Sequence, residues 1–200
     1  MGGIIDKDWE FMAQIKGFFF DLDGTLVDTH EANYFAYREA INAVTSNIVG
    51  EELRESIMAG ESSSVFLPKI VKGLETEGIA DINRQKALLY PNYLHTSKLN
   101  DYLSVFLRQM SENYVTVLVT TAKQENARAV LEAHDLTKYF TFTIFGDDVT
   151  SMKPDPEAYL RALSLSELSP AEAIAFEDSE KGLKAANAAG IQVVHIRNFS

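Results

Sequence analysis

Two aspartates stand one residue apart in the chain, directly after a run of aromatic residues, in the string FFFDLDG. Side chains i and i+2 of an extended strand point to the same side, so Asp21 and Asp23 are predicted to aim at one spot. Gly24 lets the chain turn away at once, which would set the two carboxylates at slightly different depths. This pair suits a nucleophile beside a general acid, a cation site, or both, and an ordinary polar turn is the alternative.

A hydroxyl and an ammonium group occupy comparable positions later in the chain. Thr120 ends the apolar run of VLVTTAK, where its hydroxyl could donate to a phosphoryl oxygen, although Thr120 or Thr121 could equally cap a helix. Lys153 lies in SMKPDPEAYL, where Pro154 and Pro156 stiffen the backbone that carries it. A fixed ammonium offsets the repulsion between an anionic nucleophile and a phosphate. A solvated turn lysine is the alternative interpretation.

Two further acidic residues follow another apolar run, in the string AIAFEDSEKGLKAANAAG. Glu177 and Asp178 would lie at the same sheet edge as Asp21 and Asp23 if these apolar runs form parallel strands. Together they would make an oxygen-rich pocket of the kind that Mg²⁺ prefers, with waters and phosphate oxygens completing the coordination. A helix cap formed by Asp178 and Ser179 is the alternative.

Strand-like and helix-like patterns alternate along most of the chain. This alternation is typical of a parallel sheet with helices on both faces, so we expect an α/β fold with a Rossmann-like, doubly wound core. The expected strands lie at 18–20, 115–119, 140–145, 173–176 and 191–196. The expected core helices lie at 126–134, 156–165 and 179–189.

The first two expected strands are separated by about 90 residues, far more than one crossover connection needs. Helical patterns fill this interval at 31–44, 51–58, 62–74 and 81–90. Pro68 is expected to interrupt the third helix and Pro91 to stop the fourth. An all-α cap inserted here would cover the carboxyl end of the first strand, with hinges at 28–29 and 95–99. The predicted organisation is an amino-terminal extension at 1–12, a core of 13–28 and 97–200, and the cap at 29–96.

The composition argues against several classes of partner. Apolar residues make up 46% of the chain and there is no cysteine, so a packed core without disulfides or thiolate metal sites is expected. Eighteen basic residues against 29 acidic ones give a net charge of −11, which argues against a nucleic-acid partner. No apolar run approaches the roughly 20 residues of a membrane span, and no signal-peptide pattern opens the chain. We therefore expect a cytoplasmic protein with no membrane partner.

Taken together, these strings resemble the motifs of one enzyme superfamily. DLDGTLVD looks like the first motif of the haloacid dehalogenase superfamily, Thr120 matches the second, KPDPE the third, and the string beginning AIAFED the fourth. A helical insertion after the first motif is typical of the branch with phosphoglycolate phosphatase-like and beta-phosphoglucomutase-like members. The resemblance implies a phosphoric monoester hydrolase that acts on a small phosphorylated metabolite and uses Mg²⁺ as its cofactor.

The resemblance also implies roles for the matching residues. Asp21 would attack phosphorus and become an aspartyl phosphate, and Asp23 would protonate the leaving oxygen and later deprotonate the attacking water. The carboxylates of Asp21 and Asp178 and the backbone carbonyl of Asp23 would bind the metal, and Glu177 would act through water.

The transferring phosphoryl group would be held by Thr120 and Lys153, with help from the backbone amide of Thr121. The dehalogenase reaction that names the superfamily is disfavoured, because those members lack the second aspartate and the metal, whereas Asp23 is present. We therefore expect a phosphatase whose catalytic residues are Asp21, Asp23, Thr120 and Lys153.

Two alternative functions stay open. A beta-phosphoglucomutase-like isomerase would need a cap cation for a second phosphate. Ser63 stands where such relatives carry an arginine, and only lysines such as Lys69 or Lys72 could substitute for it. A catalytically silent binding protein on the same fold is the second alternative, which the intact motifs disfavour. His30 lies close enough to the first hinge to touch a substrate.

Overall fold

The computed structural model describes residues 14–197 and 199, so the expected extension at 1–12 lies outside the described residues. The strands are β1 (Gly17–Phe20), β2 (Val27–Asp28), β3 (Lys98–Leu99), β4 (Val115–Val119), β5 (Phe142–Ile144), β6 (Ala173–Glu177) and β7 (Gln192–His195). The α-helices are α2 (His30–Thr45), α3 (Glu51–Met58), α4 (Ser63–Ile70), α5 (Thr76–Tyr93), α6 (Asp101–Met110), α7 (Gln124–Ala133), α8 (Glu157–Ser166) and α9 (Glu180–Ala188). Short 3-10 helices are η1 (Leu94–Thr96), η2 (Thr137–Tyr139), η3 (Gly146–Asp148) and η4 (Pro170–Glu172). Within this part of the chain, none of the helices combines the length and the hydropathy that a bilayer span requires.

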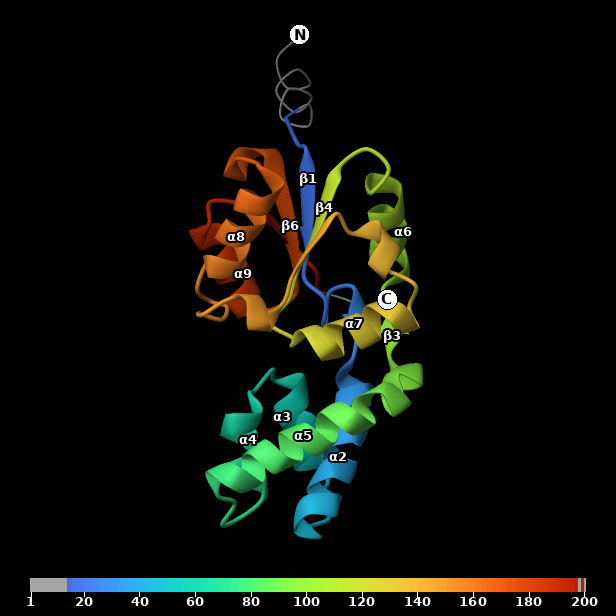
Figure 1. Cartoon of the computed structure of the whole chain (residues 1–200), viewed down its shortest axis with the longest axis vertical. Helices are drawn as coiled ribbons and strands as arrows, with labels where there is room; N and C mark the ends of the chain where they lie inside the picture. The colour runs from blue at the N-terminus through green and yellow to red at the C-terminus, as the bar shows by residue number, and fades with distance from the viewer. Residues whose placement is uncertain (1–13, 198, 200) are drawn as a thin grey trace.

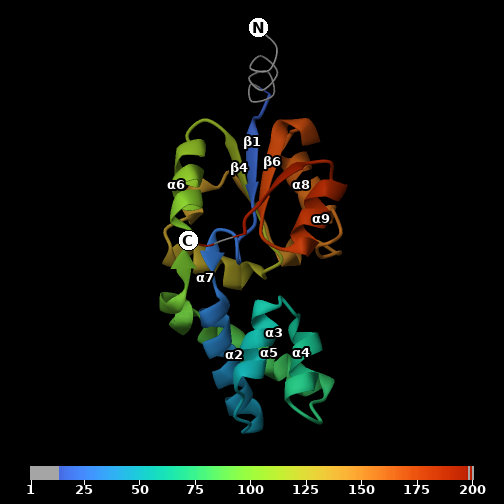
Figure 2. The same ribbon diagram turned by 180° about the vertical axis from the view of Figure 1, so that it is seen from behind.

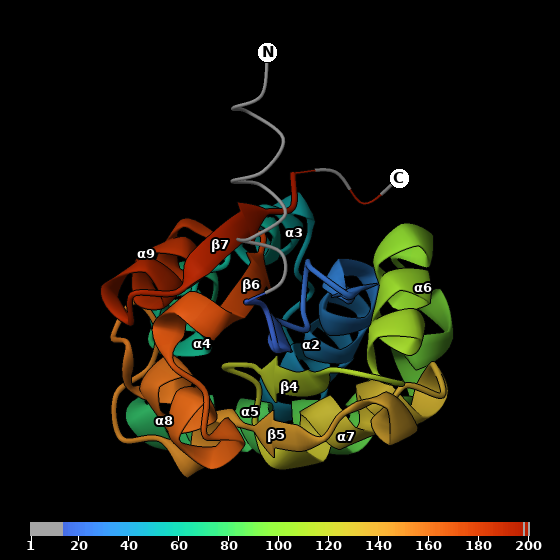
Figure 3. The same cartoon turned by 90° about the horizontal axis from the view of Figure 1, so that it is seen from above.

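Within the described residues, five strands form a parallel sheet in the order β5-β4-β1-β6-β7, with β1 at its centre (Figure 1). The phenylalanines of β1 alternate between the two faces of this sheet. Phe18 and Phe20 pack with α6 and α7, whereas Phe19 packs with α8 and α9. Helices therefore cover both faces, as Figure 3 shows from above. The expected doubly wound α/β core is confirmed.

Helices α2 to α5 form a helical layer between β2 and β3. They pack around their own apolar cluster, whose fully buried members include Ile41, Leu53 and Ile82. Figures 1 and 2 show this helical layer beyond the ends to which the strand arrows point. The layer thus covers the carboxyl edge of the sheet, where open α/β sheets bind their ligands.

Two prolines lie inside helices, contrary to the sequence prediction. Pro68 is part of α4, and Pro91 is part of α5, which continues to Tyr93. A proline removes one backbone hydrogen bond and costs roughly 3 kcal/mol in an isolated helix. The nearby side chains of Phe66 and Tyr90 are buried, so packing of the helix outweighs the lost bond.

The helix α6 is absent from the helices expected from the sequence. Its pattern is obscured because two of its apolar residues, Tyr102 and Val105, are 81% and 49% exposed. Asn100 is the N-cap residue of α6, and its side chain accepts from the amide of Leu103 at 3.1 Å. The same side chain donates to the carbonyl of Thr25 at 3.2 Å. Asn100 therefore connects the start of α6 to the loop that follows β1.

The chain crosses between the sheet and the helical layer twice, and the two crossings lie side by side. Val27 pairs with Leu99 and Asp28 pairs with Lys98, which joins β2 and β3 in an antiparallel ribbon. The crossings fall at the two positions where hinges are expected. The helical layer is therefore connected to the sheet through one narrow ribbon of chain.

Candidate active site

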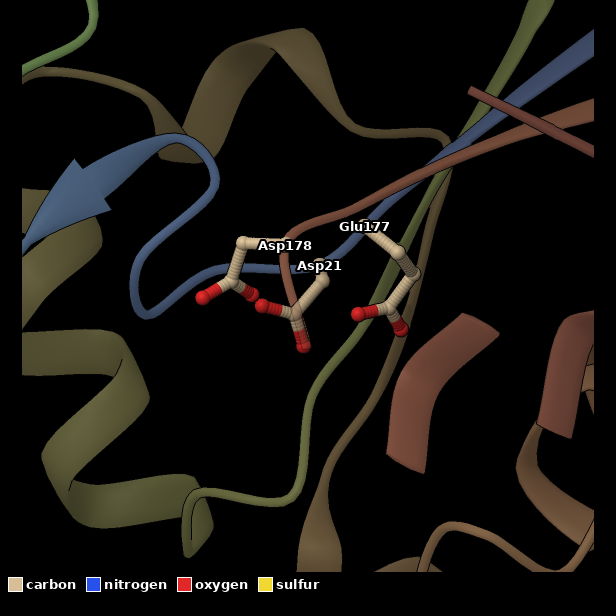
Figure 4. A group of neighbouring side chains, drawn as sticks. All are labelled: Asp21, Glu177 and Asp178. Atoms are coloured by element: carbon tan, nitrogen blue, oxygen red, sulfur yellow. The ribbon is translucent and has the colours of Figure 1, made fainter. Parts of the chain in front are cut away.

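The ends of neighbouring strands bring the expected polar side chains together. Asp21 follows β1, Thr120 follows β4 and Glu177 ends β6, and β1 lies between the other two strands. All of these side chains are buried. Asp21, Glu177 and Asp178 each offer an oxygen that lies within 4.8 Å of the others. Figure 4 shows the carboxylates of this three-carboxylate group close together beyond the strand ends.

The ammonium group of Lys153 ties Asp21 to Glu177. It donates to Asp21 Oδ1 at 2.7 Å, to Glu177 Oε1 at 2.5 Å and to the carbonyl of Val119 at 2.7 Å. An ammonium group has three hydrogens, so these contacts use all of them. Lys153 is buried, which rules out the alternative of a solvated turn lysine.

The negative charge around Asp21 exceeds what Lys153 offsets. Burial raises the pKa of Asp21 well above its usual value, Lys153 lowers it, and the charges of Glu177 and Asp178 raise it further. Burial also raises the pKa of Glu177. A further positive charge among these oxygens would favour the ionised form of Asp21. A divalent cation among these oxygens would supply it.

Asp23 has surroundings that differ from those of Asp21. Its carboxylate accepts a hydrogen bond from Thr29 Oγ1 at 2.5 Å, at the start of α2. Burial raises the pKa of Asp23, and the bond from Thr29 lowers it. A raised pKa favours the protonated form that a general acid needs. The arrangement therefore suits two carboxylates with different roles.

The two threonines after β4 are free to act on a ligand. The helix α7 begins at Gln124 and has Lys123 as its N-cap residue, so neither threonine caps it. Thr120 Oγ1 accepts from the amide of Ala122 at 3.0 Å, which leaves the hydroxyl hydrogen to donate elsewhere. The amide of Thr121 donates to no other residue of the described chain. Both hydrogens are thus available to an anionic oxygen.

Neighbouring residues hold Asp178 in place. Thr25 Oγ1 donates to Asp178 Oδ1 at 3.2 Å, a contact that the sequence analysis missed although Thr25 lies inside the first motif. Ser179 caps α9 by accepting from the amide of Gly182 at 3.1 Å, so Asp178 is not needed as a cap. Gly24 has a φ of +86°, and a Cβ there would overlap the Asp178 carboxylate. Glycine is therefore required here for its backbone and for its small size.

The residues of this site fall within the range matched by the model of a known family. A family model described as haloacid dehalogenase-like hydrolase matches residues 18–196. The chain belongs to the haloacid dehalogenase-like hydrolases. The matched range includes the whole three-carboxylate group. The family resemblance seen in the sequence is therefore confirmed.

Two curated relatives of this hydrolase are named phosphatases. The phosphorylated carbohydrates phosphatase of Thermotoga maritima is 32% identical over 188 residues, which cover 90% of this chain and 85% of the relative. The phosphoglycolate phosphatase of Photorhabdus laumondii is 27% identical over 186 residues, which cover 90% of this chain and 79% of the relative. The expected enzyme class, a phosphoric monoester hydrolase, is confirmed by these relationships.

Solved structures share the fold of this hydrolase. CbbY from Rhodobacter sphaeroides, in complex with phosphate, matches with a TM-score of 0.80 and 24% identity over 92% of this chain and 87% of that chain. A putative beta-phosphoglucomutase from Thermotoga maritima matches with a TM-score of 0.73 and 31% identity over 92% of this chain and 88% of that chain. Because CbbY is only 24% identical to this chain, its similarity concerns the fold alone.

Lys86 of this hydrolase is a buried cation that the sequence analysis missed. It lies on α5, is 6% exposed, and has its Nζ 3.7 Å from the centre of the Tyr90 ring. Burial lowers the pKa of Lys86 to about 8, and the charge of Asp23 opposes this shift. No local sequence signal marks this lysine, because lysines in helices are normally exposed. Lys69, which the sequence analysis considered, forms an exposed ion pair with Glu61 at 2.7 Å.

A pocket of about 430 Å³ opens beside Asp178 and is also lined by His30 and His195. The Nδ1 atom of His30 lies 2.7 Å from Oδ1 of Asp28, which gives this histidine a partner that the sequence did not reveal. Of the three carboxylates, only that of Asp178 lines this pocket.

Proposed function

We propose that this hydrolase is a Mg²⁺-dependent phosphatase that acts on a small phosphorylated metabolite through an aspartyl-phosphate intermediate. The observation that carries the proposal is the arrangement of two aspartates. Asp21 is bound by Lys153 within the three-carboxylate group, and Asp23 has a pKa that burial raises. The names of the relatives support phosphorylated carbohydrates or phosphoglycolate as the substrate class.

Asp21 acts as the nucleophile in this proposal. Lys153 binds Oδ1 of Asp21, so Oδ2 is the oxygen available to attack phosphorus. The new oxygen–phosphorus bond forms as the bond to the leaving oxygen breaks, which divides one difficult displacement into two. The hydroxyl of Thr120 and the amide of Thr121 donate to the phosphoryl oxygens, where negative charge is held during transfer.

Asp23 moves the protons. In its protonated form it donates to the leaving oxygen, and its carboxylate then takes a proton from the water that attacks the phosphorus of the intermediate. This second displacement releases phosphate and returns Asp21 to its free form. The hydrogen bond from Thr29 holds the Asp23 carboxylate at the boundary between the sheet and the helical layer.

The three-carboxylate group fits Mg²⁺. Its members supply the oxygen ligands that this ion prefers, and Asp21 and Asp178 are the direct ligands in our proposal, together with the backbone carbonyl of Asp23. Glu177 Oε2 is buried and has no hydrogen-bond partner among the described residues, which leaves it for contact through a water. The bound ion would offset the charge of the phosphoryl group and keep Asp21 ionised.

Lys86 provides a test of how the helical layer recognises substrate. In Lys86→Met we expect KM to rise about tenfold or more, because a charged hydrogen-bond donor near the leaving group is lost. The free energy of unfolding at pH 7 should rise by up to about 3 kcal/mol, because burial lowers the pKa of Lys86 and its charged form destabilises the folded chain. This gain should shrink as the pH rises from about 8 towards 10.5, where Lys86 also loses its proton in the unfolded chain. Steady-state kinetics and thermal unfolding at pH 7 and pH 10 measure both effects.

Lys69→Met is the matched control for this prediction. Lys69 lies in the same helical layer, but it is exposed and paired with Glu61. An exposed pair contributes little to stability, so neither KM nor the unfolding temperature should change appreciably. An unchanged KM in Lys86→Met would place Lys86 outside the substrate site.

Lys86 also favours a second candidate function, a beta-phosphoglucomutase-like isomerase. A mutase must hold the distal phosphate of a sugar bisphosphate while the intermediate turns over, which requires a cation in the helical layer. One solved structure similar to this chain is named a putative beta-phosphoglucomutase. A lysine is a point charge, however, and lacks the bidentate geometry of the arginine that the resemblance would place where this chain has Ser63. We therefore expect water to accept the phosphoryl group.

A screen of phosphorylated metabolites, with phosphate release measured with and without Mg²⁺, tests the proposed function. It should include phosphoglycolate, sugar phosphates and nucleoside monophosphates. Incubation with a hexose 1-phosphate, followed for both free phosphate and 6-phosphate product, separates the two candidates. We expect phosphate release to dominate. Stoichiometric isomerisation with little free phosphate would replace the phosphatase with the isomerase.

A further inference from the structure

Tyr159 on α8 is a fully buried residue with a polar group that no proposed catalytic step uses. Its hydroxyl donates to Glu177 Oε1 at 2.5 Å. A buried hydroxyl without a partner is costly, whereas a bond to a charged carboxylate is among the stronger hydrogen bonds. Burial raises the pKa of Tyr159 well above its usual value, so the hydroxyl keeps its hydrogen at neutral pH. The phenol therefore serves Glu177 as a permanent donor.

The Glu177 carboxylate is held from several sides. Its Oε1 accepts two hydrogen bonds, from Tyr159 on α8 and from Lys153 in the segment before α8. On α9, a Cβ added to Gly182 would overlap the same carboxylate, so the backbone of that helix lies directly against it. Rotation of the carboxylate would break the bond from Tyr159 or press against α9. Tyr159 thus sets the place of Oε1.

The position of Glu177 Oε1 in turn determines the position of the Lys153 ammonium group. The Lys153 ammonium group is bound by Oε1 of Glu177, by Oδ1 of Asp21 and by the carbonyl of Val119. Its three hydrogens are shared among these acceptors, so the position of each acceptor contributes to the place where the ammonium group is held. The contact between Lys153 and Asp21 therefore depends on Glu177.

We propose that Tyr159 is a positioning residue for the nucleophile: it fixes Glu177, and through Glu177 it fixes Lys153 against Asp21. This inference rests on the proposed function of Asp21 and Lys153. Hydrogen bonds run from Tyr159 on α8 to Glu177, and from Lys153 to both Glu177 and Asp21. Residues that orient groups directly bound to a reacting centre typically change activity by about 10-fold to 100-fold when altered.

Tyr159→Phe removes the hydroxyl and keeps the ring that packs in the core. We expect kcat to fall about tenfold with KM changed less than about twofold, because the substrate contacts remain while the nucleophile is held less well. Tyr34→Phe is the matched control, since Tyr34 is also buried and its hydroxyl makes no hydrogen bond with the described residues. It should leave kcat unchanged. A kcat for Tyr159→Phe equal to that of the wild type would overturn the proposal.

A double-mutant cycle tests whether Tyr159 acts through Glu177. Adding Tyr159→Phe to Glu177→Gln should lower kcat by less than about twofold beyond the effect of Glu177→Gln alone, because the route to Lys153 is already broken. Full additivity of the two effects would show that Tyr159 acts elsewhere and would overturn the proposal.

Crystal structures of the wild type and Tyr159→Phe give a readout that does not depend on activity. We expect the Lys153 ammonium group to leave Asp21 Oδ1 in the variant. An unchanged contact, with an unchanged Glu177 carboxylate, would overturn the proposal. If the wild type hydrolyses no phosphate ester but this displacement is seen, the proposed function fails and the positioning role stands.

Discussion

Asp21→Asn is expected to lower kcat by at least about a thousandfold on any phosphate ester that the wild-type enzyme hydrolyses. The variant keeps the shape of the side chain and an oxygen that can accept from Lys153, but it lacks the carboxylate that we propose attacks phosphorus. The unfolding temperature at neutral pH, without added metal, should hold or rise. Burial raises the pKa of Asp21, so its ionised form destabilises the folded chain. The gain should disappear below about pH 4, where Asp21 is also protonated in the unfolded chain.

Asp101→Asn is the control for this change. Asp101 lies in the first turn of α6, exposed to solvent and outside the site, so kcat and stability should stay close to those of the wild type. Phosphate release and thermal unfolding are the two measurements. Retention of more than about a tenth of the wild-type kcat in Asp21→Asn would remove this residue from the chemical step.

Removal of divalent metal by a chelator is expected to stop phosphate release, and added Mg²⁺ is expected to restore it. Asp178→Ala should raise the Mg²⁺ concentration for half-maximal activity by at least about tenfold, because one proposed oxygen ligand of the three-carboxylate group is lost. Calorimetric titration of the enzyme with Mg²⁺ should show the same loss of affinity without substrate. Ca²⁺ should inhibit, since it favours longer bonds and more ligands than Mg²⁺.

Glu180→Ala tests whether the Mg²⁺ requirement depends on Asp178 itself or on any acidic residue nearby. Glu180 lies in the first turn of α9, two residues after Asp178, and is exposed. Its removal should leave the Mg²⁺ requirement within about twofold of the wild-type value, because an exposed charge is screened by salt. Full activity of the wild type in excess chelator would contradict the metal site.

The residues at the strand ends were predictable because the signals that place them are local. An apolar run followed by a polar residue marks the end of a buried strand, and parallel strands end at one edge. Asp21, Thr120 and Glu177 could therefore be grouped before any contact between them was known. Gly24 likewise marks a turn by its type alone.

Contacts that depend on packing between distant elements could not be read in the same way. Tyr159 meets Glu177 from another element of the fold, and the letters around it indicate only an amphipathic helix. Lys86 is buried because the helical layer places it near Asp23, whereas propensity alone assigns a helical lysine to the surface. Pro91 remains inside α5 for a similar reason, since packing of the helix outweighs a local penalty.

The ribbon of β2 and β3 restricts how the site can open. Because both connections of the helical layer run through this ribbon, the layer is expected to swing about one axis. A swing of this kind would widen the entrance to the site most on the side of α3 and α4, which lie away from β3 in Figure 1. Substrate would then enter and phosphate leave from that side, on the microsecond to millisecond timescale of such motions.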